Sequence, residues 1–293
     1  ASTIPGKMHA CGHDGHTTML LGTAKYLAET RNFSGTVHVI FQPAEENLAG
    51  GGVMVQEGLF ERFPMQRVFG LHNWPGGERG TFLWKEGPMM AAVANLEVEI
   101  TGKGAHGAMP HQGVDPIVAS AAIIQALQSI VARNVEPVDA GVITIGSIQG
   151  GFTYNVIPST VRMLGTARWF LPEVGDLLEA RFHQVVRGVA ESLGCTAETR
   201  FLRAYPATVN DAESTQLAIP AAAAVVGAEK VKELPKPTTG AEDFSFMLNA
   251  CPGSYLFLGG EGAASVHHPL YDFDDAILPI GASFFATLAE QLL

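Results

Sequence analysis

Ten consecutive residues near the start of the chain, Met-His-Ala-Cys-Gly-His-Asp-Gly-His-Thr at positions 8–17, constrain the protein more than any other stretch. Thiolate and imidazole side chains suit zinc and related transition metals, and the glycines let neighbouring side chains converge. Because no Cys-x-x-Cys pair follows, the remaining ligands must come from distant parts of the chain, which is typical of a catalytic metal site. The alternative is a polar turn that happens to be rich in histidine.

Length and composition narrow the class of protein. A chain of 293 residues favours two domains, and a content of 47% hydrophobic and 16% charged residues is that of an ordinary globular protein. The net charge of −11 argues against a nucleic-acid or anionic-membrane partner. Three cysteines cannot all pair in disulfides, so we expect a reducing, cytoplasmic compartment. We expect no apolar run long enough to span a bilayer.

Residues 14–75 predict an α/β arrangement. Candidate cap residues at 14–17 and apolar periodicity predict a helix through Glu29, with Cys11 and His13 on the turn that leads into it. Apolar runs rich in β-branched residues predict strands at 36–41 and 68–71. The first strand leads into the acidic pair 45–46, and the second ends at His72. Open α/β sheets carry their sites at such strand ends, so both positions are candidates for chemistry.

The sequence between residues 94 and 204 predicts a separate unit. Its elements follow the order β-α-β-β-α-β, which is that of a ferredoxin-like α+β unit. The predicted ranges are 96–101, 116–133, 141–148, 161–168, 172–193 and 196–204. Because α/β character resumes after Tyr205, we expect this unit to be inserted into a discontinuous domain formed by residues 1–93 and 205–293.

Five side chains near the ends of predicted elements are candidates for direct metal ligands. They are Cys11, His13, Glu46, His72 and His267. Together they supply soft, borderline and hard donors, as a two-metal hydrolytic centre requires. With two neighbouring ions one ligand must bridge, and an ionised Cys11 thiolate could do so. The alternative for Cys11 is a small buried apolar residue.

Glu45 precedes Glu46, so on an extended chain the two carboxylates point to opposite sides. If the chain turns at Pro43, one of them can bind metal while the other takes a proton from water and delivers it to a leaving nitrogen. A solvated acidic pair after a turn is the alternative.

In the inserted unit, Lys103, His106 and His111 lie in a glycine-rich loop. A histidine there could polarise a substrate carbonyl, although a surface histidine is the default interpretation. Arg168 ends an apolar strand and could pair with a substrate carboxylate, or it could be an ordinary edge charge.

Several motifs, taken together, resemble one family over nearly the whole chain. The chain is similar to M20-type metallo-amidohydrolases, of the branch that holds hippurate hydrolases, N-acyl-amino-acid deacylases and auxin-conjugate hydrolases. The motifs are Met-His-Ala-Cys-Gly-His-Asp-Gly-His-Thr (8–17), Gln-Pro-Ala-Glu-Glu (42–46), Leu-His-Asn-Trp-Pro (71–75), Gly-Lys-Gly-Ala-His-Gly-Ala-Met-Pro-His (102–111), Asn-Val-Ile-Pro (155–158), Gly-Thr-Ala-Arg (165–168) and Glu-Asp-Phe (242–244).

The resemblance implies an aminopeptidase-like di-metal catalytic domain interrupted by a dimerisation or lid domain, and a homodimer formed through it. It implies two divalent ions per subunit (Zn, Mn, Co or Ni), with Cys11, His13, Glu46, His72 and His267 as the ligands. Family members usually carry Asn or Ser after the final ligand, whereas this chain has His268, and we expect His267 to be the ligand.

The same resemblance implies roles for further residues. It makes Glu45 the general base and His106 an oxyanion donor that can reach the partner subunit's site. Asn155 and Arg168 resemble substrate-contacting residues, with Arg168 on the α-carboxylate. Within the first motif, Asp14 and His16 resemble supports that orient the ligands.

The predicted activity is hydrolysis of N-acyl amino acids, of the hippurate or N-acetyl type, to a carboxylate and a free amino acid. The alternatives are a metallo-dipeptidase or carboxypeptidase of the same family, a thiol hydrolase with Cys11 as nucleophile, and a non-catalytic binding module. Family members carry a helix and strands before the first motif. We therefore expect the N-terminal part of the catalytic domain to be absent here, and an inactive fragment is a further alternative.

Overall fold

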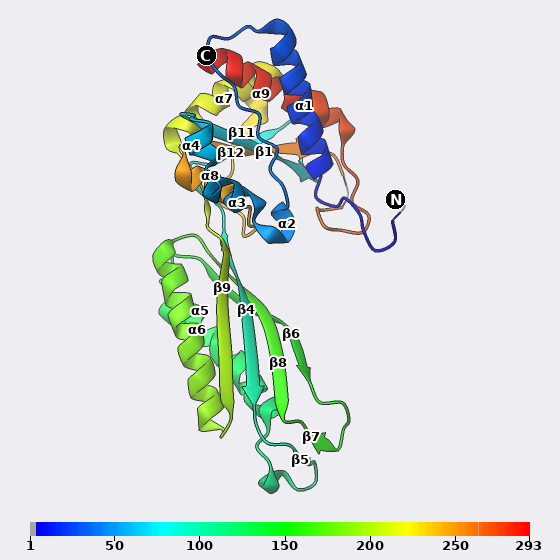
Figure 1. Ribbon diagram of the computed structural model, residues 1–293, viewed down its shortest axis with the longest axis vertical. Coiled ribbons are helices and arrows are strands. Elements are labelled where there is room, and N and C mark those ends of the chain that lie inside the picture. Colours follow the sequence, from blue (N-terminus) through cyan, green and yellow to red (C-terminus); the bar gives the residue numbers. More distant parts are fainter. Residues whose placement is uncertain (1–3, 263) are drawn as a thin grey trace. The chain divides into compact units, whose positions relative to one another are not determined.

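The computed structural model describes residues 4–262 and 264–293, and the chain forms two compact units (Figure 1). The first unit comprises Ala1–Met89, Thr208–Thr238 and Asp243–Leu293, and the second comprises Met90–Ala207 with Thr239–Glu242. Both units combine sheets with helices, in agreement with the predicted α/β class.

A four-stranded mixed sheet forms the centre of the first unit. Its order is β1 (Val68–Pro75), β12 (Gly253–Gly260), β2 (Phe82–Trp84) and β11 (Val231–Glu233). Strands β1 and β12 are parallel, whereas β12 and β2 are antiparallel. All eight residues of β12 are buried, as expected for a central strand covered on both faces. A second, two-stranded sheet pairs β10 (Thr208–Asn210) with β3 (Gly87–Met90).

Helices cover both faces of this sheet. Helices α1 (His13–Thr30), α7 (Ala212–Val226) and α9 (Leu278–Leu292) lie on one side, and α3 (Gly50–Gln56), α4 (Leu59–Arg62) and α8 (Ser245–Ala250) on the other (Figure 1). Helices α1 and α9 approach closely, because a Cβ atom at Gly281 would lie 2.2 Å from Met19 Sδ. The start of α1 is therefore fixed against the core of the unit.

The strand predicted at residues 36–41 is wrong, since the structure assigns neither strand nor helix to these residues. Residues 37–40 are half-buried and Phe41 is exposed. Local β propensity makes a strand only where a neighbouring strand completes the hydrogen-bond ladder, and none of the described strands pairs with this segment.

The second unit has the predicted β-α-β-β-α-β order. Its elements are β4 (Ala92–Thr101), α5 (Pro116–Asn134), β6 (Gly141–Gly150), β8 (Thr160–Trp169), α6 (Pro172–Ser192) and β9 (Thr196–Tyr205). The strands form an antiparallel sheet in the order β6-β8-β4-β9, and both helices pack against one face of it (Figure 1). The Asp115 carboxylate caps α5 by accepting a hydrogen bond from the Ile117 N–H at 2.8 Å.

Helix α5 corrects the expectation about apolar runs. By length and composition alone, Pro116–Asn134 could cross a membrane. However, Ala119, Ile123, Leu127 and Ile130 are fully buried in the core of the second unit. Their spacing of three and four residues is that of a helix packed along one face, and a core helix meets the same criterion of length and apolarity.

Candidate metal centre

The His-rich cluster lies at the start of helix α1. Gly12 precedes the helix with a φ of 95°, and a Cβ atom there would lie 2.6 Å from both Asn73 Oδ1 and Tyr271 Oη. The helix begins at His13, before the cap residues expected at 14–17, so His13 lies in the first turn of the helix and not on the turn leading into it. Cys11 is buried immediately before the helix. This close turn brings the Cys11 and His13 side chains to the same centre.

His72 reaches this centre from strand β1, which continues to Pro75 and so places His72 within the strand rather than at its end. Its Nδ1 donates a hydrogen bond to the Asn73 carbonyl at 2.7 Å. In the neutral ring the Nε2 atom then carries no proton, and it faces Cys11 Sγ at 3.3 Å. The imidazole is thus oriented to offer Nε2 as a ligand.

His267 reaches the centre from a loop of the C-terminal segment. Its φ is 66°, and its backbone N–H donates to the Ala10 carbonyl at 2.5 Å, which ties this loop to the cluster. Its Nε2 lies 3.4 Å from Glu46 Oε1. The neighbouring His268 instead accepts a hydrogen bond from the Leu270 N–H through Nδ1.

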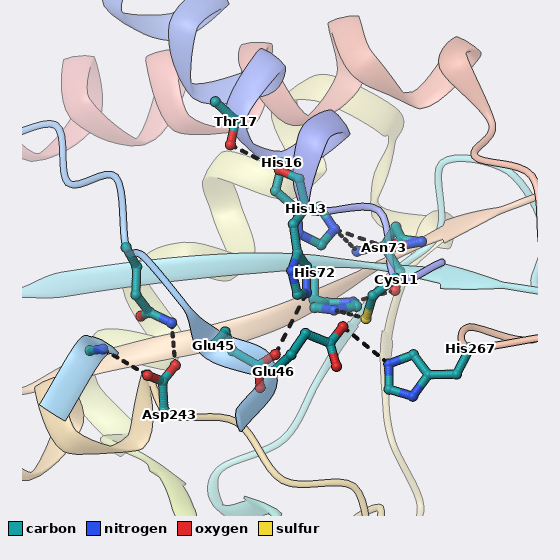
Figure 2. A network of polar contacts seen from close by, with 12 residues as sticks. Cys11, His13, His16, Thr17, Glu45, Glu46, His72, Asn73, Asp243 and His267 are labelled. Atoms are coloured by element: carbon teal, nitrogen blue, oxygen red, sulfur yellow. Dashed lines mark hydrogen bonds and ion pairs between the residues drawn. The ribbon is translucent and has the colours of Figure 1, made fainter. Parts of the chain in front are cut away.

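Two groups of possible ligand atoms overlap at Cys11 (Figure 2). In each group the ligand atoms lie within 4.8 Å of one another: one joins Cys11 to His13 and His72, and the other joins Cys11 to Glu46 and His267. A thiolate shared by two such sets can bridge two cations, each of which also has harder nitrogen or oxygen donors. This donor chemistry fits two divalent transition-metal ions. The assignment of the individual ligands stays a prediction.

Glu45 and Glu46 open the short helix α2 (Glu45–Leu48), and both belong to a third group with His13. Glu45 Oε2 lies 3.7 Å from His13 Nε2. The Glu45 side chain is 16% exposed and that of Glu46 is 48% exposed. The two carboxylates therefore face one centre, and Glu45 is the more shielded from water.

Hydrogen bonds link three polar side chains next to the metal-binding residues: His16, Asn73 and Tyr271. The Asn73 N–H donates to His16 Nε2 at 3.0 Å, and Asn73 Nδ2 donates to Tyr271 Oη at 2.8 Å. Burial, with the imidazoles of His72 and His13, lowers the pKa of His16 well below its usual value of 6.5. Burial also raises the pKa of Tyr271. The sequence analysis did not propose Asn73 or Tyr271 as site residues. Asn73 could have been found from its position directly after His72 in the motif 71–75, whereas Tyr271 lies in none of the motifs.

The residues predicted to contact substrate lie in the second unit. His106 belongs to β5 (Ala105–His106), which pairs with β7 (Val156–Ile157), and the Gly107 N–H donates to the Asn155 carbonyl at 2.8 Å. His106 and Asn155 are therefore neighbours, and both are exposed.

Arg168 lies elsewhere in the same unit. It is near the far end of β8, eight residues or about 27 Å along the strand from Thr160, where β8 begins. Burial lowers the pKa of its guanidinium group, and Nη1 points to the Thr239 carbonyl at 3.5 Å. The structure thus brings His106 and Asn155 together but keeps Arg168 away from them.

Comparison with known proteins decides the family. Residues 1–291 match peptidase family M20/M25/M40. The chain belongs to this family. The M20 resemblance predicted from the motifs is confirmed, and with it the class of hydrolases that act on amide C–N bonds.

Curated relatives of this M20 chain carry closely related names. It is 38% identical over 286 residues to hippurate hydrolase of Campylobacter jejuni, an alignment that covers 98% of this chain and 74% of the relative. It is 40% identical over 295 residues to N-acetyl-L-cysteine deacetylase of Bacillus subtilis, with 100% and 70% covered. These names describe enzymes that release acyl groups from amino acids.

The M20 chain also matches solved structures. The crystal structure of the Bacillus subtilis YxeP protein, described as a dinuclear metal binding peptidase of the M20 family, is 34% identical with a TM-score of 0.81. The match covers 100% of this chain and 75% of that one. The predicted fold class is confirmed, and the dinuclear description of the YxeP protein agrees with the two overlapping ligand groups around Cys11.

Proposed function

We propose that this M20 protein hydrolyses the amide bond of N-acyl amino acids with the help of two divalent metal ions. The observation that carries the proposal is the pair of ligand groups that share Cys11, with the shielded Glu45 carboxylate beside them. The names of the relatives, hippurate hydrolase and N-acetyl-L-cysteine deacetylase, support the N-acyl amino acid as the substrate class.

In the proposed reaction the metal ions activate water and the substrate carbonyl, and Glu45 transfers the proton. When bound among these residues, two divalent ions would lower the pKa of a water molecule and polarise the amide carbonyl. Glu45 takes a proton from the attacking water and later delivers a proton to the departing nitrogen. The products are a carboxylate and a free amino acid. Only 16% of the Glu45 side chain is exposed and its Oε2 lies 3.7 Å from His13 Nε2, so the carboxylate faces the metal-binding residues rather than bulk solvent.

The identity of the metal is open to a direct test. A thiolate, imidazoles and a carboxylate suit Zn, Mn, Co or Ni. We expect dialysis against a chelator to abolish turnover and the return of one of these ions to restore it. Elemental analysis of the active protein should give two ions per chain.

We propose that the second unit binds substrate and forms a homodimer. His106 would donate to the developing oxyanion, Asn155 would contact the substrate, and Arg168 would pair with its α-carboxylate. His106 and Arg168 lie toward opposite ends of β8, a separation much longer than an N-acyl amino acid. If both act on one substrate, they come most simply from two subunits, which supports the dimer.

Complementation between subunits tests the dimer. A mixture of His106→Ala and Glu45→Gln protein, dissociated and reassociated together, should regain part of the activity that each variant lacks. Light scattering should give twice the mass of one chain. A monomeric active enzyme would refute this arrangement.

The substrate class is tested with a panel of compounds. Metal-loaded protein should hydrolyse hippurate and N-acetyl amino acids faster than dipeptides with a free amino group. If dipeptides were the better substrates, the dipeptidase alternative would replace the proposal. No turnover of any compound in the panel would contradict both.

The contact between Cys11 and His72 also favours a second candidate. A thiol 3.3 Å from an imidazole has the geometry of an activated nucleophile in a thiol hydrolase. The two mechanisms differ in their response to chelation. A preparation free of metal that is active, and that loses activity when Cys11 is alkylated, would support the thiol mechanism.

We also propose a reducing compartment such as the cytoplasm. None of the three cysteines, all of which are described, forms a disulfide. A Cys11 ligand must stay reduced to bind metal. Cell fractionation with an antibody against the protein tests the location.

A further inference from the structure

The short helix that carries both glutamates is held between two strained residues. Helix α2 (Glu45–Leu48) is flanked by Ala44 with a φ of 53° and by Ala49 with a φ of 50°. The left-handed region is strained for alanine, and such a conformation persists only where the surroundings fix it. Contacts outside the helix must therefore hold this backbone.

One buried carboxylate supplies such contacts at both ends of the loop (Figure 2). Asp243 is fully buried, and its Oδ2 accepts a hydrogen bond from the Gly51 N–H at 2.7 Å. Its Oδ1 accepts a hydrogen bond from the Gln42 side-chain amide. Gln42 lies just before the strained Ala44 and Gly51 just after Ala49, so the carboxylate joins the two flanks of the α2 loop, residues 42–51.

The loop closes tightly on these contacts. A Cβ atom at Gly50 would lie 1.9 Å from the Pro43 carbonyl oxygen, so the end of the loop passes directly against its start. A Cβ atom at Gly51 would lie 3.1 Å from both Asp243 Oδ2 and the Gln42 side chain. The glycines allow the close approach, and Asp243 fixes it.

We propose that Asp243 is a positioning residue, whose carboxylate clamps the α2 loop and thereby sets Glu45 and Glu46 at the metal centre. A buried carboxylate needs several hydrogen bonds to offset its lost hydration, and Gly51 and Gln42 donate two of them. The role given to Glu45 rests on the proposed function. The clamp itself does not depend on the substrate.

The hydrogen-bond donors around residue 243 suit an aspartate. The Gly51 N–H and the Gln42 amide are both donors, and a carboxylate can accept from both at once through its two oxygens. An asparagine of the same shape would direct its own NH2 group at one of them. Asp243→Asn should therefore break one side of the clamp with almost no change in volume.

Exchanging the acid and the amide between positions 42 and 243 should restore both hydrogen bonds of the clamp. In the double variant Gln42→Glu/Asp243→Asn, the asparagine donates to the new glutamate and still accepts from the Gly51 N–H. Gln42→Glu alone replaces the amide donor by a second carboxylate that repels Asp243. It serves as the matched control for the double variant. If Asp243→Asn does not fold, Gln42→Leu removes the same hydrogen bond at a half-buried position.

Two measurements test the proposal. In steady-state kinetics of the metal-loaded protein, kcat of Asp243→Asn should fall about 10- to 100-fold with KM nearly unchanged. The double variant should recover most of the loss, and Gln42→Glu should be at least as impaired as Asp243→Asn. In metal-free protein, hydrogen exchange of residues 42–52 should be faster in Asp243→Asn, with strand β12 and the second unit unaffected.

The outcomes separate this inference from the proposed function. Unchanged kcat and unchanged exchange in Asp243→Asn would overturn the clamp, as would faster exchange throughout the first unit or a double variant no better than the single one. If exchange responds locally and is restored by the double variant but no N-acyl amino acid is hydrolysed by the wild type, the clamp stands and the proposed substrate class fails.

Discussion

Cys11 Sγ lies 3.3 Å from His72 Nε2, although the two residues are 61 positions apart in the chain. The first belongs to the turn before α1, and the second to strand β1. Cys11 Sγ also lies within 4.8 Å of possible ligand atoms of Glu46 and His267. One sulfur atom therefore connects segments from the beginning, the middle and the end of the first unit.

Replacement of Cys11 should affect both metal ions at once. We expect Cys11→Ser to weaken metal binding about 10- to 100-fold or more, because an alcohol is a poorer bridging ligand than a thiolate. Metal titration followed by elemental analysis measures the effect. Cys195→Ala, in the core of the second unit, is the control and should lose stability but keep both ions. Loss of a single ion in Cys11→Ser would argue against a bridging thiolate.

Substitution of the two adjacent glutamates should affect different properties, kcat for Glu45 and metal content for Glu46. Glu45→Gln should lower kcat about 100- to 10,000-fold with both metal ions retained, because it removes the group that transfers the proton. Glu46→Gln should lower metal content, since it removes a donor near Cys11 and His267. Parallel measurements of kcat and bound metal distinguish the two. If Glu45→Gln lost metal and Glu46→Gln kept it, the roles would be exchanged.

Helices and strands were predictable where apolar periodicity and cap residues within a few positions of the sequence mark them. Helix α5 was expected at 116–133 and lies at Pro116–Asn134, and β8 was expected at 161–168 and lies at Thr160–Trp169. Apolar periodicity and cap residues act over a few positions, so one sequence suffices to predict them. The three-residue strands β2 and β11 are too short to give such a pattern.

Long-range relationships could not be derived in this way. The segment 36–41 has strand composition but no partner among the described strands, and pairing is a property of the whole fold. The left-handed Ala44 and Ala49 leave no trace in the sequence, because alanine does not mark that conformation as glycine does. Likewise, nothing in Glu-Asp-Phe indicates that Asp243 is the carboxylate that clamps α2. The five candidate metal ligands were recognisable by residue type and by their positions near the ends of predicted elements, and the resemblance to a known family implied their roles.

The N-terminus of helix α7 should make stability depend on pH. Asp211 caps the helix, and hydrogen bonds from the Ser214 hydroxyl and N–H, with the charge of Arg67, lower the pKa of Asp211 below 3.8. At neutral pH we expect Asp211→Ala to cost about 1 kcal/mol of the free energy of unfolding. Because the folded pKa is the lower one, this contribution is complete above pH 3.8 and is lost as the pH falls through the folded value.

Urea unfolding of wild type and Asp211→Ala at several pH values measures this dependence, and the two midpoints should converge in acid. Glu213→Ala is the control, because Glu213 forms an exposed ion pair with the same Arg67 and should contribute little. A gap between wild type and Asp211→Ala that stays constant down to the most acidic pH would contradict the assignment.

His267 and its neighbour offer the sharpest test of the metal centre, because two adjacent histidines have the same chemistry and different geometry. His267 Nε2 lies 3.4 Å from Glu46 Oε1, whereas His268 Nδ1 accepts a hydrogen bond from the Leu270 N–H within its own turn. We expect His267→Ala to lose one ion per chain and about 10- to 100-fold in activity, because the group around Cys11 and Glu46 then lacks its nitrogen donor. His268→Ala should keep both ions and lose only local order in the turn. Elemental analysis and kcat of the two variants, measured side by side, test this assignment. A loss of metal confined to His268→Ala would identify His268, and not His267, as the ligand.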